Sequence, residues 1–101
     1  MKLVIVTAVE EFQKDVLKLF KEANIKNFSS SEIGGHKNGS QILMASNWFS
    51  SERHSNESIM FFSFTKEEYI KALFNNIKAF NEKLDTNNPI KAVVVPIERS
   101  I

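Results

Sequence analysis

The stretch Glu32–Ser58, EIGGHKNGSQILMASNWFSSERHSNES, decides how the rest of the chain is organised. It holds all three glycines, both histidines and the only tryptophan of the 101-residue chain. The segments on either side of it have the patterns of neighbouring strands, and the stretch is far longer than their connection requires. We therefore expect a small scaffold that presents one long loop.

Outward from this loop, four short segments have the composition of β-strands. Leu3–Val6 and Ala92–Val95 are continuous apolar runs rich in β-branched residues, and Ile59–Phe64 is apolar and aromatic. These three are predicted strands one, four and three. Strand two is predicted over Asn27–Ile33, although its serine cluster Ser29–Ser31 would also suit a loop.

Two further segments have the helical period. Glu10 and Glu11 suit the first turn of a helix, and Asn24 suits the left-handed residue that ends it. The apolar residues between them recur on one face: Phe12, Val16, Leu19, Phe20 and Ala23.

The second helix is predicted to begin at a capping box, Thr65–Glu68, with Phe64 and Tyr69 forming a hydrophobic staple. The helical period then continues through Ile70, Leu73, Phe74, Ile77 and Phe80, and Pro89 forbids its extension.

The element order is thus β-α-β-β-α-β, which predicts an α+β, ferredoxin-like sandwich in a single domain, residues 1–101. An antiparallel four-stranded sheet would carry both helices on one face, with strands one and three at its centre. A sheet covered on one face should alternate apolar and polar residues, yet LVIV, IMFF and AVVV are apolar throughout. We therefore expect the second face to be covered by further copies of the chain.

Composition excludes several classes of partner. A hydrophobic content of 43% and a charged content of 25% are ordinary for a globular domain, and a net charge of +1 gives no case for nucleic acid. There is no cysteine, and no apolar run approaches the roughly 18 residues of a membrane span. Because the first residues also lack a signal-peptide pattern, we expect a cytoplasmic protein without direct membrane insertion.

The opening MKLVIVTAVEEFQKDVLKLFKEANIKNFSSSEIGGHKNG and the later AVVVPIE resemble the PII-type (nitrogen regulatory) signalling proteins. The resemblance implies a homotrimer whose sheets face inward and which is not an enzyme. It also implies a small ligand at clefts between subunits, and a long loop that contacts a membrane transporter or a metabolic enzyme. The chain departs from the family in Leu84–Ala92, which lacks the glycine-rich pattern, and after the last strand, where the basic residues reduce to Arg99.

By this resemblance, the ligand-binding residues are expected at the loop base and around strand four. They are Gly34, Gly35, His36, Lys37, Lys91 and Arg99. The partner-binding part of the loop would be Trp48, Phe49, Glu52 and Arg53. The glycine pair would equally suit a bulge, Asn38–Gly39 a hairpin, and the Trp-Phe pair the loop's own small core. Lys37–Glu57 is expected to be mobile in the free protein and to become ordered against a partner. No residue pattern in the sequence identifies the ligand or a cofactor.

The two histidines support an alternative, a metal-binding or metal-tolerance trimer of PII-like or CutA-like type. His36 and His54 are possible imidazole ligands, with Glu52 and Glu57 as the nearest carboxylates. Gly35-His36 also resembles a pair found in PII-like proteins associated with metal efflux pumps.

Two other uses of this element order have less support. Phe61, Phe62 and Phe64 would suit an RNA-recognition module, but its Lys/Arg-Gly signature is missing. An acylphosphatase-like enzyme would need an arginine after strand one, where Glu10 stands instead. No grouping of nucleophile, base and carboxylate is present in the sequence to support catalysis.

Overall fold

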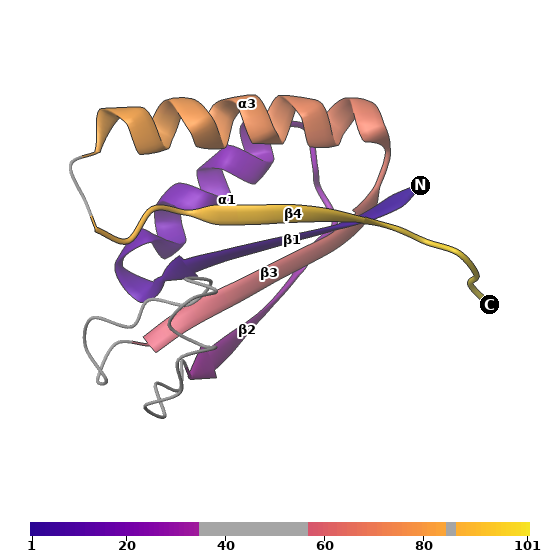
Figure 1. Ribbon diagram of the computed structural model, residues 1–101, viewed down its shortest axis with the longest axis horizontal. Helices are drawn as coiled ribbons and strands as arrows, with labels where there is room; N and C mark the ends of the chain where they lie inside the picture. The colour runs from indigo at the N-terminus through magenta and orange to yellow at the C-terminus, as the bar shows by residue number, and fades with distance from the viewer. Residues whose placement is uncertain (35–56, 85–86) are drawn as a thin grey trace.

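The computed structural model describes residues 1–34, 57–84 and 87–101. Its elements follow the predicted order β-α-β-β-α-β (Figure 1). They are β1 (Lys2–Val9), a short 3-10 helix η1 (Glu10–Phe12), α1 (Gln13–Glu22), β2 (Ser29–Gly34), β3 (Glu57–Thr65), α3 (Glu67–Lys83) and β4 (Lys91–Pro96).

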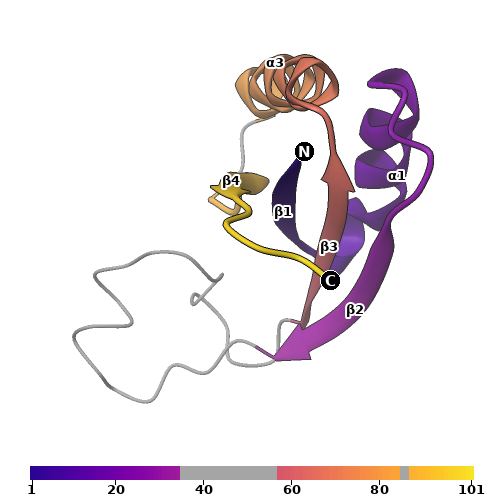
Figure 2. The ribbon, with the colours of Figure 1, turned by 90° about the vertical axis from the view of Figure 1, so that its right-hand side faces the viewer.

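The four strands form one antiparallel sheet in the order β2-β3-β1-β4. Both central strands are those predicted, because β1 pairs with β3 on one side and with β4 on the other. Both helices lie against the same face of this sheet (Figure 2). The ferredoxin-like α+β fold predicted from the sequence is confirmed.

The hydrophobic core fills the space between the sheet and the two helices. Val4 and Val6 point into it from β1, and Phe61, fully buried, points into it from β3. Phe20 of α1 lies between two aromatic rings, with ring centroids 4.7 Å from Phe28 and 5.9 Å from Phe61. The helix residues predicted to face the core do so, with Phe74 and Phe80 only partly buried. The most buried are Val16, Phe20, Ala23, Ile70 and Leu73.

Strands β1, β3 and β4 are longer than the sequence predicted, whereas β2 begins at Ser29 and not at the predicted Asn27. β1 continues through Val9, and β3 runs from Glu57 to Thr65, because the two strands pair along eight consecutive positions. The serine cluster Ser29–Ser31 belongs to β2, where it pairs with Phe62, Phe61 and Met60. Pairing with an already formed central strand outweighs the weak strand propensity of serine.

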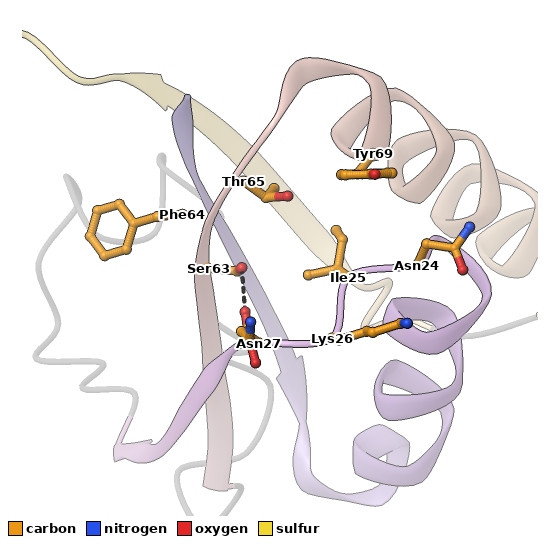
Figure 3. Close-up of a pocket in the computed structure, with 8 residues that line it drawn as sticks. All are labelled: Asn24, Ile25, Lys26, Asn27, Ser63, Phe64, Thr65 and Tyr69. Atoms are coloured by element: carbon orange, nitrogen blue, oxygen red, sulfur yellow. Dashed lines mark hydrogen bonds between the residues drawn. The ribbon is translucent and has the colours of Figure 1, made fainter.

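The start of the second helix is where the sequence prediction was wrong. The N-cap is Lys66, with no side-chain cap, and Thr65 stays in β3 opposite Lys2. The staple is absent too, since Phe64 is 56% exposed and points away from Tyr69 (Figure 3). Ladder pairing keeps residue 65 extended, which delays the helix by one position. The end of α1 is as predicted, with Asn24 in the left-handed region at φ 64°.

Candidate functional site

The face of the sheet turned away from the helices carries a cluster of apolar residues from β1, β3 and β4. The register places Leu3 opposite both Phe64 and Val95, and Ile5 opposite Phe62. We call this set the open face: Leu3, Ile5, Met60, Phe62, Phe64, Val93 and Val95. Neither helix covers it (Figure 2). The apolar runs predicted as strands one, three and four therefore place apolar side chains on both faces of the sheet.

Several open-face side chains reach solvent. Phe64 is 56% exposed and Val95 39% exposed, while Phe62 is half-buried. The rings of Phe62 and Phe64 meet edge to face, with centroids 6.5 Å apart. Contiguous exposed apolar surface of this kind marks an interaction site.

The long loop leaves the sheet and returns to it at one place. Gly34 is the last residue of β2 and pairs with Glu57, the first residue of β3. The remaining loop residues assigned to ligand, partner or metal binding lie outside the described residues: Gly35, His36, Lys37, Trp48, Phe49, Glu52, Arg53 and His54. Their roles stay predictions.

Lys91 stands at the same end of the sheet as Gly34, but on the opposite edge. It opens β4 and pairs with Thr7, so two strands separate it from β2, a spacing of about 14 Å. Burial lowers the pKa of the Lys91 ammonium, because partial desolvation disfavours its charged form. The described residues provide no ion pair for it. An anion placed there would offset that cost.

Arg99 lies elsewhere. Pro96 pairs with Lys2 at the far end of β1, and Arg99 follows beyond it, exposed. One subunit therefore does not bring Gly34, Lys91 and Arg99 together. A cleft that contains all three requires residues from more than one copy.

The sequence analysis missed the residue that holds the start of β4. The Asn81 carboxamide of α3 accepts the Ile90 N–H at 3.0 Å and donates to the Ile90 carbonyl at 2.9 Å. This double hydrogen bond fixes the backbone next to Lys91. An asparagine inside a helical pattern is unfavourable by propensity, and that conflict was the available signal.

Asn81→Ala is expected to lower the free energy of unfolding by about 1–3 kcal/mol, because the buried Ile90 backbone loses both partners. Urea unfolding measures the change. The neighbouring Asn75→Ala, exposed on the same helix, should change it by less than about 0.5 kcal/mol. Equal effects of the two substitutions would contradict the role given to Asn81.

Two other properties bear on function. Among residues 1–34, 57–84 and 87–101, no group of three histidine, aspartate, glutamate or cysteine side chains is placed to hold a metal ion. No helix in the same part of the chain combines the length and apolarity needed to cross a membrane.

No family model and no curated protein matches the sequence. The fold, by contrast, is similar to solved PII-like structures. A PII-like signalling protein from Thermus thermophilus has a TM-score of 0.62 at 15% identity, over 95% of this chain and 85% of its own. CPII from Thiomonas intermedia K12, bound to ADP, AMP and acetate, has a TM-score of 0.64 at 15% identity, over 97% and 88%. The apo form of CPII gives 0.59 at 14% identity, over 98% and 92%. The resemblance to PII-like signalling proteins is therefore confirmed at the level of the fold.

Proposed function

We propose that this chain is a non-enzymatic, PII-like signalling protein that acts as a homotrimer. It holds a small ligand in clefts between subunits and contacts a membrane transporter or an enzyme through its long loop. The observation that carries the proposal is the open face, an apolar surface on a PII-like fold.

The open face gives the driving force for assembly. Burying a large apolar side chain stabilises by about 1.5–3 kcal/mol, and each copy contributes several such side chains. Three copies with their open faces turned to a common axis remove this surface from water. Contacts between different edges of neighbouring copies would be heterologous, and such contacts form a closed ring when the rotation between copies closes, here after three copies.

Ring closure would also complete the ligand cleft. Gly34 and Lys91 stand at one end of the sheet on opposite edges, so in a head-to-tail ring the Lys91 edge of one copy faces the Gly34 edge of the next. In this arrangement the partly desolvated Lys91 ammonium gains an anionic ligand as its partner.

The ligand is expected to be smaller or less charged than ATP. A triphosphate carries about four negative charges and needs converging amides and cations. The segment Leu84–Lys91 has no glycine to let the backbone approach, and Pro89 has no amide hydrogen. CPII itself has been solved bound to ADP and AMP, so these nucleotides are the first ligands to test.

Light scattering and calorimetry test the proposal together. We expect a trimeric mass at micromolar concentration, and weak or absent ATP binding beside measurable binding of a smaller anion such as AMP. Lys91→Ala should weaken any anion binding about tenfold or more, because a charge-assisted contact is lost. Lys78→Ala, an exposed lysine of α3, is the matched control.

A monomeric mass would overturn the proposal, and micromolar ATP binding that depends on Lys91 would overturn its ligand class. The alternative function, metal binding, is tested by calorimetric titration of the same protein with divalent cations. It would replace the proposed ligand only if metal binding disappears in both His36→Ala and His54→Ala.

A further inference from the structure

A groove of about 380 Å³ opens on the helix side of the sheet, where the chain crosses from α1 to β2 (Figure 3). Thr65 of β3 forms one side, and Asn24 and Lys26 the other. Tyr69, in the first turn of α3, lies at the top of the groove in this view, and the buried Ile25 lies between the two sides. None of these residues belongs to the loop-base cleft.

The walls of the groove are held by specific bonds. The Ser63 hydroxyl donates to the Asn27 carbonyl at 2.6 Å, which ties the crossing segment to β3 (Figure 3). On the other side, the Ile25 N–H donates to the Phe20 carbonyl at 3.0 Å. Asn24 turns the chain with a positive φ of 64°. The groove therefore exists before any ligand binds, which lowers the entropic cost of binding.

Thr65 is the first sign that the groove takes a polar molecule. Its side chain is more than nine-tenths buried, at 8% exposure, and lines the groove. The hydroxyl makes no hydrogen bond with the residues that the structure describes. Among the described residues no buried side-chain oxygen or nitrogen lacks a partner, so the Thr65 oxygen is reached by solvent from the groove. A ligand there can exchange a hydrogen bond with it in place of water.

Charge indicates the class of ligand. Lys26 is exposed and has no ion pair within the described residues, and no carboxylate lines the groove. One ammonium matches one negative charge, whereas a phosphate dianion needs several cations or amides. Asn24, Thr65 and Tyr69 add neutral hydrogen-bonding groups around it.

From these observations we propose that the groove binds a small organic monocarboxylate that also carries a hydroxyl group. The carboxylate pairs with Lys26, and the hydroxyl bonds to Thr65 and Tyr69. This site is independent of the ligand cleft proposed above. Phe64 of the open face also lines the groove, so assembly through that face would cover this one wall. Asn24, Lys26, Thr65 and Tyr69 lie off the open face and stay accessible.

Nuclear magnetic resonance on the uniformly ¹⁵N-labelled full chain tests the site, with sodium glycolate as the probe. We expect saturable shifts of the Asn24, Thr65 and Tyr69 amide signals in the millimolar range. Neutral glycolamide, which has the same shape without the charge, and inorganic phosphate should cause no saturable shift at these residues. Shifts caused by phosphate alone would overturn the proposed class of ligand.

Variants then assign the contacts. Lys26→Gln and Tyr69→Phe should each weaken glycolate binding about tenfold, the loss expected for one good polar contact. Thr65→Val, which is nearly isosteric, should also weaken glycolate binding about tenfold. If Thr65→Val does not fold, Tyr69→Phe alone tests the hydroxyl contacts. Lys14→Gln removes an equal charge from α1 away from the groove and should change nothing. No saturation by glycolate, or equal weakening in Lys14→Gln and Lys26→Gln, would refute this site. Either result would leave the proposal of a trimer unaffected.

Discussion

Phe62→Lys is expected to separate the proposed trimer into monomers that remain folded. Phe62 sits in the middle of the open face, opposite Ile5 and in edge-to-face contact with Phe64. Its replacement would put an unpaired ammonium group into each buried interface, at a cost of several kcal/mol per copy. The isolated subunit tolerates the change, because this side chain is only half-buried within it.

Light scattering across a concentration series measures the mass, and circular dichroism checks the fold. Phe61→Lys is the matched control, one position away on the other face of β3, where the native ring is fully buried. That variant should unfold instead of dissociating. A Phe62→Lys protein that keeps its trimeric mass would show that assembly does not use the open face.

The second large effect is expected in the core. Phe20→Ala should lower the free energy of unfolding by about 3–5 kcal/mol, because it removes a fully buried ring and leaves a cavity. The ring also contacts Phe28, just before β2, and Phe61 of β3, so both of these residues lose a contact with α1. Since domains of this size have only about 5–15 kcal/mol of stability, the variant should be close to unfolding at 37 °C.

Chemical denaturation gives the size of that loss. Leu17→Ala, on the same helix but 39% exposed, is the comparison and should cost about 1 kcal/mol or less. A Phe20→Ala loss as small as that of Leu17→Ala would mean that α1 does not pack against the sheet as described.

The element order was predictable because it depends on local signals, and the central strands followed from that order through the right-handed crossover rule. The apolar residues of α1 and α3 repeat every three or four positions, and that period survives in any tertiary context. Asn24 was likewise readable, since asparagine is one of the few residues that adopts a left-handed conformation at a helix end.

The boundary at Thr65 shows where local signals fail. A threonine three residues before a glutamate has the pattern of a capping box, yet here it is a strand residue paired with Lys2. Asn81 was missed for a related reason. Its two partners are the backbone groups of Ile90, nine positions away in a connection that the helical pattern does not include.

The sequence by itself determined that three strands would place apolar residues on both faces of the sheet, since LVIV, IMFF and AVVV have no polar alternation. It could not determine which of two neighbouring valines faces which way. Register decides this: Val95 pairs with Leu3 on the open face, and Val94 with Val4 on the helix side. A shift of one residue would exchange the two sets without changing composition. Only the tertiary structure could also place Thr65, Lys26 and Tyr69 around one groove, because three separate segments supply them.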